Sequence, residues 1–259
     1  MLVCPVRGCG LPLMRTGRRV ACQRDHSFDV ARSGYINLLQ PQDRRSKNPG
    51  DSARVVAARR RLHERGVTSP LLDGIAGFLS PDSRDAVLDA GCGDGFYLGA
   101  LQQRSGFSGH GVDISVSAVN AAAKRYPLCE WIVANADRFI PYASGAFSMV
   151  LSITGRMNAA EFRRVMREDG KLLVGVPAPD DLKELRSRSQ QEGRDRTPTT
   201  IEIFAPHFRL IERRRATTVA DLDAAAVQDV LHSIYRPFRR EAVQAMRVTF
   251  SLDLLLFAL

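Results

Sequence analysis

A glycine-rich run near the middle of the chain restricts the fold more than any other feature. Residues 87–95 read Val-Leu-Asp-Ala-Gly-Cys-Gly-Asp-Gly, so Gly91, Gly93 and Gly95 alternate directly after an apolar segment. Glycine adopts the positive φ angles of a tight turn and lets a ligand approach the backbone closely. Between a strand and a helix, such a turn predicts a nucleotide-like ligand, although a purely structural turn has the same appearance.

An acidic residue follows at a meaningful distance. The next predicted strand ends Gly111-Val112-Asp113, twenty residues beyond Gly93. In doubly wound sheets a carboxylate at this place accepts hydrogen bonds from the ribose hydroxyls of a nucleotide. The alternative role for Asp113 is that of a helix N-cap. Both elements would lie at the carboxyl ends of parallel strands, where ligands of open α/β sheets bind.

The surrounding sequence alternates between short apolar strands and helices. We predict strands at 86–89, 109–113, 130–133, 147–153 and 171–176, and helices at 53–64, 71–79, 96–104, 115–125 and 159–167. Beyond Pro179 we predict a helix near 180–190, a strand near 208–218, a helix from 221 to about 235 and a strand at 248–257. This alternation indicates a parallel sheet with helices on both faces, ending in an antiparallel hairpin at one edge.

The first forty residues lack helical periodicity and a conventional core, but they concentrate metal-ligand side chains. Cys4, Cys9, Cys22 and His26 form two close pairs with the spacing Cys-x4-Cys-x12-Cys-x3-His. Three thiolates and one imidazole are the ligand set of a closed, tetrahedral structural zinc site. Such a site would supply the folding energy that this segment otherwise lacks. Chance clustering of unliganded residues is the alternative.

The excess of positive over negative charge lies at the same end of the chain. The 259 residues carry a net charge of +9, and residues 1–65 hold fourteen Lys or Arg against five Asp or Glu, so the remainder is neutral. A phosphate-rich partner would favour this asymmetry, whereas a basic patch that only aids solubility is the alternative. Residues 41–52 read as a polar linker that ends in Asp51-Ser52, good capping residues for the next helix.

The spacing of the glycines distinguishes between two cofactors. Asp89-x-Gly91-x-Gly93-x-Gly95 resembles the turn of class I methyltransferases rather than that of dehydrogenases, whose last glycine lies one residue further on. This resemblance implies that S-adenosylmethionine is the cofactor. The cofactor residues it implies are Asp89, Gly91, Gly93, Asp113, Ile114, Asn135 and Ala136, the last two placed for contact with the adenine.

The whole pattern resembles the 23S rRNA (guanine-N1) methyltransferases, which include macrolide-resistance enzymes of the tylosin type. The cysteine–histidine cluster and the glycine turn are joined by Asp-Val-Ala-Arg-Ser-Gly-Tyr-Ile-Asn-Leu-Leu at 29–39, Asn-Pro-Gly-Asp-Ser at 48–52 and Ala-Ala-Ala-Lys-Arg-Tyr-Pro at 121–127. The match extends from Cys4 to about Pro179. It implies a class I doubly wound, mostly parallel seven-stranded sheet with a small N-terminal zinc-binding domain that grips an rRNA hairpin.

Three regions follow from this resemblance. Residues 1–40 are expected to form a zinc-binding RNA-recognition module, 41–82 a basic linker with helices, and 83–259 the methyltransferase domain. The residues expected to contact RNA are Arg44, Arg45, Lys47, Arg59 and Arg60.

The chain departs from the family at two places. After the fourth strand it reads Ile-Thr-Gly-Arg at 153–156, where the family has an Ile-Tyr-Ala-Pro-like run that lines the target-base pocket. The family's Thr-Pro-Phe-like segment appears as Ser-Ile-Tyr-Arg-Pro-Phe-Arg-Arg at 233–240. Both departures concern the acceptor side of the resemblance, whereas the cofactor residues match it.

Methylation of guanine N1 needs a group that removes the N1 proton and one that stabilises the resulting anion. We assign these roles to Asp51 and to Arg156 or Arg59, respectively; the alternative is that Asp51 only caps its helix and that the arginines face phosphate or solvent. Two other functions are weighed, a small-molecule methyltransferase and a non-catalytic RNA-binding protein. The basic N-terminus argues against the first and the glycine turn against the second. We expect 23S rRNA as partner, no membrane association, a possible homodimer and a cytoplasmic location.

Overall fold

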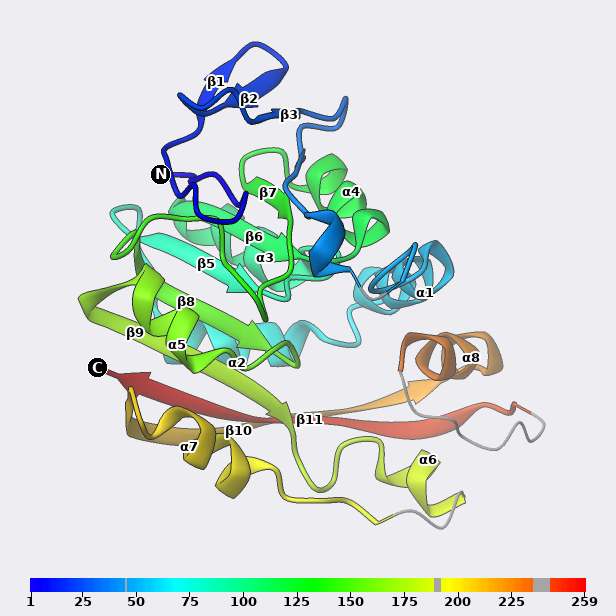
Figure 1. Cartoon of the computed structure of the whole chain (residues 1–259). Coiled ribbons are helices and arrows are strands. Elements are labelled where there is room, and N and C mark those ends of the chain that lie inside the picture. The colour runs from blue at the N-terminus through cyan, green and yellow to red at the C-terminus, as the bar shows by residue number, and fades with distance from the viewer. Residues whose placement is uncertain (45, 189–191, 235–242) are drawn as a thin grey trace.

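The computed structural model describes residues 1–44, 46–188, 192–234 and 243–259, and shows a small N-terminal module on one side of a large sheet (Figure 1). The module holds a three-stranded antiparallel sheet in the order β1-β2-β3. Its strands are β1 (Met14–Thr16), β2 (Arg19–Ala21) and β3 (Ser27–Asp29). Three residues a strand cannot bury a core of their own, so the module needs other sources of stability.

The large sheet has the order β10-β11-β9-β8-β5-β6-β7-β4. Its strands are β4 (Ile36–Asn37), β5 (Ala86–Ala90), β6 (Ser108–Asp113), β7 (Glu130–Val133), β8 (Phe147–Ile153), β9 (Met166–Pro177), β10 (Arg209–Leu222) and β11 (Met246–Ala258). Every neighbouring pair in the part of the sheet that runs β9-β8-β5-β6-β7-β4 is parallel, whereas β11 is antiparallel to both of its neighbours, β9 and β10. The seven predicted strands of the methyltransferase sheet are therefore present, and β10 and β11 form the predicted hairpin.

Helices and the module divide the two faces of this sheet between them. The helices are α1 (Ala53–Glu64), α2 (Ser69–Leu79), α3 (Phe96–Ser105), α4 (Val116–Arg125), α5 (Ala159–Val165), α6 (Lys183–Arg188), α7 (Thr197–Phe204) and α8 (Ala224–Ser233), with a 3-10 turn, η1, at Pro41–Asp43. Side chains of α2, α3, α4 and α8 share one buried cluster. Those of α5, α7 and the module share the other, so the module covers part of a sheet face (Figure 1).

Local sequence signals set several of these boundaries. Helix α1 begins where predicted because the side chain of Ser52 accepts a hydrogen bond from the N–H of Val55. Strand β5 is buried on both faces, as its apolar run indicated, with Val87 and Leu88 both fully buried. Gly106, in the left-handed region, ends α3.

The structure corrects the sequence-based elements at four places. Asp221 and Leu222, predicted to begin a helix, are the last residues of β10 because they pair with Arg247 and Met246, and α8 begins only at Ala224. The helix predicted over 159–167 ends at Val165, because Met166 already pairs with Phe147 as the start of β9. Helix α7 was not predicted, since its β-branched residues favour strands; it is held by Phe204, which is fully buried and stacked on Phe162. Strand β4 adds an eighth strand at the edge of the sheet. No helix among the described residues is long and apolar enough to span a membrane.

Candidate active site and metal centre

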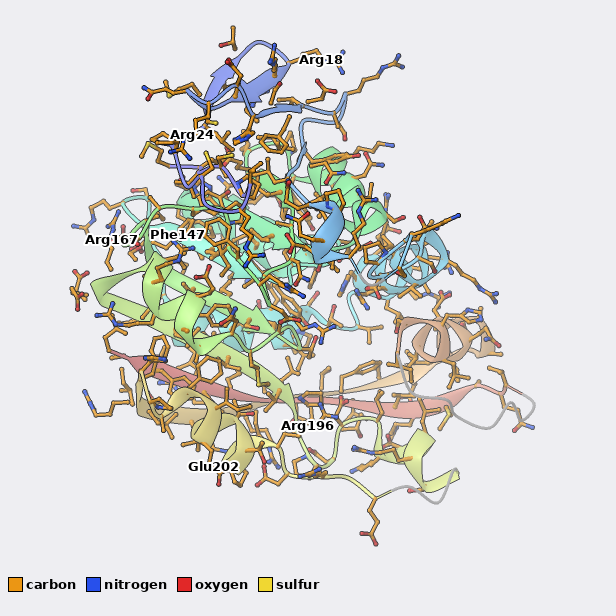
Figure 2. The ribbon with its side chains drawn as sticks, viewed as in Figure 1. Arg18, Arg24, Phe147, Arg167, Arg196 and Glu202 are labelled. Atoms are coloured by element: carbon orange, nitrogen blue, oxygen red, sulfur yellow. The ribbon has the colours of Figure 1, made fainter. Side chains whose placement is uncertain are left out.

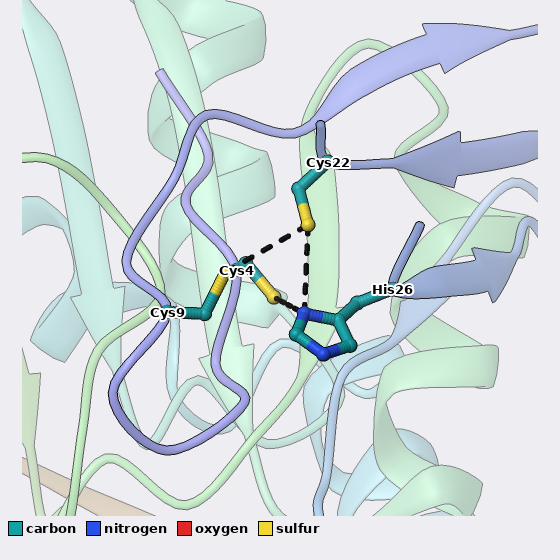
Figure 3. Close-up of side chains that lie close together, drawn as sticks. All are labelled: Cys4, Cys9, Cys22 and His26. Atoms are coloured by element: carbon teal, nitrogen blue, oxygen red, sulfur yellow. Dashed lines mark hydrogen bonds between the residues drawn. The ribbon is translucent and has the colours of Figure 1, made fainter. Parts of the chain in front are cut away.

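The four predicted metal ligands converge in the module (Figure 3). All their ligand atoms lie within 4.8 Å of one another. The Sγ atoms of Cys9 and Cys22 are 3.7 Å apart, and Nδ1 of His26 lies 3.4 Å from the Sγ of Cys4 and 3.5 Å from that of Cys22. Zinc with tetrahedral sulfur and nitrogen ligands places those atoms roughly 3.5–3.8 Å apart. The donor set and its geometry therefore fit zinc.

Two tight turns bring these ligands together. In the first, the N–H of Cys9 donates to the carbonyl of Val6, and in the second the N–H of Asp25 donates to the carbonyl of Cys22. Burial acts to raise the pKa of the Cys22 thiol, but backbone hydrogen bonds at Arg24 and His26 outweigh it and lower this pKa to about 7. A thiolate is the form that binds a metal, so the second turn favours binding.

The glycine turn has the backbone geometry that its sequence predicted. Gly91, Gly93 and Gly95 have φ angles of +88°, +55° and +76°. A Cβ at Gly95 would lie 2.4 Å from the ring of Trp131, and one at Gly91 would lie 3.1 Å from the Cα of Gly155. Positive φ and close packing therefore both require glycine here, and the turn keeps its backbone open toward the ligand.

Two carboxyls flank this turn, Asp89 buried and Asp113 partly buried. Asp113 accepts hydrogen bonds from the N–H groups of Gly93 (3.0 Å) and Ser115 (2.8 Å), and burial still raises its pKa. A carboxylate offers about four lone-pair sites, so Asp113 can also accept from a ribose hydroxyl. Burial, followed by the charge of Asp113, raises the pKa of Asp89 to about 8. The turn thus combines backbone donors with acidic acceptors, as a cofactor with hydroxyl and ammonium groups requires.

A cavity of about 1100 Å³ opens along the carboxyl edge of the sheet. The cofactor residues predicted from the sequence all line it: Asp89, Gly91, Gly93, Asp113, Ile114, Asn135 and Ala136. It continues past β8 and β9 to Leu252 on β11. Five strand spacings separate β7 from β11, or roughly 24 Å. The cavity therefore has a cofactor end at β5–β7 and a distal end at β9–β11, with room for a second ligand.

The predicted base lies in this cavity. The Asp51 side chain is 8% exposed, and its Oδ2 accepts a hydrogen bond from Arg59 at 2.7 Å. The backbone holds the position, since the hydroxyl of Ser115 donates to the carbonyl of Asp51 at 2.7 Å. Arg59 also donates to the carbonyl of Ser233 at 3.3 Å, which links α1 to the end of α8. Asp51 and Arg59 thus face the cofactor turn as an ion pair, while Ser52 supplies the side-chain cap.

The altered run after β8 packs directly on the glycine turn. Thr154 has a φ of +52°, which is rare for a β-branched residue. A Cβ at Gly155 would lie 2.6 Å from the carbonyl oxygen of Ala90. Arg156 is 72% exposed at the rim of the cavity and approaches Asp137 at 3.4 Å. Position 155 therefore has to be glycine, while Arg156 reaches toward Asp137, next to Asn135 and Ala136, which are predicted to contact the adenine.

The structure separates the residues predicted to contact RNA. Arg44 and Lys47 are exposed on the segment that joins the module to α1, whereas Arg59 lies in the cavity. Arg60 is exposed and paired with Glu64 at 2.7 Å. Arg45 and most of the 233–240 segment lie outside the described residues. Figure 2 shows Arg18 and Arg24 on the module, at the end of the molecule opposite Glu202.

Sequence reasoning missed several polar residues of the cavity. His63 is buried, stacks on Phe96 at 3.8 Å, and shares a 2.6 Å hydrogen bond with Thr68. Burial lowers its pKa to about 3, so it is neutral and its 3.8 Å approach to Asp94 is not an ion pair. His63 lies one helical turn after Arg59 on α1 and therefore on the same face of the helix, which is the sequence signal that could have identified it.

Comparison with known proteins identifies relatives along most of the chain. A 23S rRNA (guanine(748)-N(1))-methyltransferase from Streptomyces fradiae is 35% identical over an alignment of 242 residues, and the match covers 89% of this chain and 83% of that protein. A Bacillus subtilis (strain 168) protein named for 23S rRNA (guanine-N(1)-) methylation is 33% identical over an alignment of 249 residues, and the match covers 89% of this chain and 84% of that protein. The chain belongs to the 23S rRNA (guanine-N1) methyltransferase family.

Two family models match this methyltransferase, one over the N-terminal module and one over the large sheet. The zinc-ribbon model described as RlmA, N-terminal matches residues 2–47, and the methyltransferase domain model matches residues 87–173. A possible histamine N-methyltransferase from Thermotoga maritima has a TM-score of 0.52 at 14% identity, over 79% of this chain and 96% of that one. The MccD protein has a TM-score of 0.51 at 15% identity, over 72% and 94%. The class I fold, S-adenosylmethionine dependence and the zinc ribbon are thereby confirmed.

Proposed function

We propose that this enzyme transfers a methyl group from S-adenosylmethionine to N1 of a guanine in a hairpin of 23S rRNA. The observation that carries the proposal is the cavity, because one continuous space joins the glycine turn to a distal end large enough for a base. Family membership supports guanine N1 as the acceptor. The exposed arginines of the module, including Arg18 and Arg24, provide phosphate-binding charge on the same molecule.

The reaction needs alignment and the removal of one proton. S-adenosylmethionine supplies a methyl group on a positively charged sulfur. N1 of guanine forms a bond to the methyl carbon as the carbon–sulfur bond breaks, and the electron pair of that bond stays on sulfur. The N1 proton leaves to a base, and the protein lowers the barrier chiefly by holding N1 in line with the methyl carbon.

In this proposal Asp51 is the base and the glycine turn holds the cofactor. Arg59 donates a hydrogen bond to the carboxylate of Asp51, and the hydroxyl of Ser115, which donates to the backbone carbonyl of Asp51, keeps this residue beside the turn. Asp113 binds the ribose, while Asn135 and Ala136 contact the adenine. The exposed Arg156 stays a candidate for stabilising the guanine anion. A cytoplasmic location follows from the rRNA substrate, and a homodimer remains a prediction that light scattering would test.

Primer extension on ribosomal RNA tests this function. Methylation at N1 blocks base pairing, so reverse transcriptase should stop one nucleotide before a single guanine of 23S rRNA. We expect the stop after incubation of unmodified 23S rRNA with the wild-type protein and S-adenosylmethionine, and no stop with Asp113→Ala. Labelled methyl groups should enter the same RNA.

The contrary outcomes separate the alternatives. Cofactor binding without transfer to any ribosomal RNA would contradict the proposal and favour a small-molecule acceptor, as would RNA binding no tighter than that of a neutral protein. RNA binding without measurable cofactor binding in calorimetry would favour a non-catalytic RNA-binding protein. A stop at a nucleotide other than guanine would support methylation of 23S rRNA but contradict guanine N1 as the acceptor.

A further inference from the structure

The distal end of the cavity contains a buried cation that the proposed mechanism does not use. Arg186 lies on the short helix α6, is 5% exposed and lines the cavity together with Leu182, Phe250 and Leu252. Helix α6 follows β9 closely in the sequence. It is held at the distal end of the cavity by a hydrogen bond that the N–H of Leu182 donates to the carbonyl of Thr249 on β11. Arg186 therefore stands over the strands beyond β8, on the side of the cavity away from the cofactor turn.

The interactions of Arg186 differ from those of the buried carboxylates Asp229 and Asp253. Its Nη2 donates to the carbonyl of Pro179 at 2.7 Å, and among the described residues it forms no ion pair. By contrast, buried Asp253 is paired with Arg215 at 3.0 Å, and buried Asp229 is paired with Arg61. A guanidinium has five N–H donors, and burying its charge without an acceptor is costly. Arg186 thus has donors left for a ligand that carries an electron-rich oxygen.

The two arginines assigned from the sequence are less suited to this role. Arg59 already binds Asp51, and Arg156 is 72% exposed and near Asp137. A charge acts more strongly where water is excluded, because the effective dielectric constant is lower there. Arg186 combines deep burial with the lack of a carboxylate partner among the residues that the structure describes, which suits it to stabilise a developing anion.

Resting on the proposed function, we infer that Arg186 is a catalytic residue that donates hydrogen bonds to O6 of the target guanine. When N1 gives its proton to the base, the electron pair left on N1 is shared with O6 through the ring. The positive charge of Arg186 stabilises that oxygen until N1 takes the methyl group, after which O6 is a neutral carbonyl oxygen again. The planar guanidinium also suits the O6 edge of guanine, the contact arginine makes most often with this base.

Kinetics of substituted proteins test this inference. Arg186→Met removes the charge with little change in side-chain volume, and Arg186→Lys keeps the charge but not the planar guanidinium with its paired N–H donors. Lys183→Ala, at an exposed residue of the same helix, is the control. We expect kcat on 23S rRNA to fall about 100-fold or more for Arg186→Met and about tenfold for Arg186→Lys. Lys183→Ala should leave kcat unchanged, and the Kd for S-adenosylmethionine should be unchanged in all three.

The pH profile separates a catalytic from a purely structural role. Without the cation the N1 proton is harder to remove, so kcat of Arg186→Met should keep rising with pH beyond the point where the wild-type value levels off. A kcat for Arg186→Met within threefold of wild type would overturn the inference. A second outcome would also overturn it: a lower kcat together with a lower Tm, weaker cofactor binding and an unchanged pH profile. In that case Arg186 would only hold the loop that contains Pro179. If the wild-type protein itself methylates no RNA, the proposed function fails instead.

Discussion

The N-terminal module and the large sheet reach ordered structure by different means. In the module, β1 is exposed at all three of its residues, and its ordered centre is a cluster of three cysteines and a histidine. In the sheet, β5 and β8 are buried almost throughout. Removal of apolar surface from water stabilises the sheet, whereas the module buries only a few apolar side chains and needs additional folding energy from metal binding.

The two regions are nevertheless joined at a defined place. Ile36 and Asn37 of β4 pair with Ile132 and Val133 of β7 as an added parallel strand. Leu2 and Ile36 also belong to the same buried cluster as Leu88 on β5. The module therefore depends on its metal for internal order and on the sheet for its position, so the end of the molecule that we propose to bind RNA is fixed relative to the cavity.

Loss of the metal should have the largest effect and should be confined to one region. Cys9→Ala removes one ligand, and structural zinc contributes on the order of 10 kcal/mol to the folding of such modules. We expect residues 1–35 to lose protection from hydrogen exchange and RNA affinity to fall sharply. Cofactor binding should change less than threefold; a parallel loss of cofactor affinity would show that the two regions do not differ as described.

A change in the glycine turn should damage the other region. Gly95→Ala puts a Cβ into the ring of Trp131 at a positive φ, which should lower the free energy of unfolding by about 4 kcal/mol and abolish cofactor binding. Gly145→Ala is the matched control, since Gly145 also has a positive φ (+63°) but nothing within 4 Å of its Cβ position. Denaturant melts should show a loss of only about 1 kcal/mol for the control. Equal losses in the two proteins would mean that packing on Trp131 is unimportant.

A substitution at the junction should affect both regions. Ile36 is 1% exposed, and Ile36→Ala should cost about 3 kcal/mol through the cavity it leaves. We expect exchange protection to fall in β7 and in the module together, although the zinc ligands are intact. Met14→Ala, on an exposed strand of the module, is the control. A loss of exchange protection in the module without a loss in β7 would show that Ile36 does not join the two regions.

The smallest predicted effect is a pH dependence of cofactor affinity. The pKa of Asp89 is about 8 in the cofactor-free protein, and a positively charged cofactor bound beside it should lower this pKa. Below pH 8 the free protein then carries more protons than the complex, so affinity should rise with pH up to about 8, by at most about tenfold per unit, and then level off. Calorimetry in buffers of different ionisation enthalpy would detect the released proton. Asp89→Asn should bind more weakly and without this dependence, and a constant wild-type affinity would contradict the assignment.

Much of this structure follows from local signals in the sequence. The bounds of α1, β7 and β8 agree with prediction, because caps and apolar runs act over a few neighbouring residues. The metal ligands could be recognised from residue type and spacing, although only folding brings Cys4 within 3.4 Å of His26. The glycine turn indicated its own backbone geometry, since positive φ angles are a property of glycine itself.

Tertiary structure decided the features that depend on distant partners. Met166 became a strand residue by pairing with Phe147, β4 joined the sheet through β7, and α7 formed around Phe204 against Phe162. The same holds for the site. Nothing in the sequence near Arg186 distinguishes it from the exposed Arg156, because its burial, and its lack of an acidic partner within the described part of the chain, depend on how α6 packs against β11 and the segment after β9. Residue type thus determined which chemistry this chain could perform, and long-range packing determined which side chains are placed to perform it.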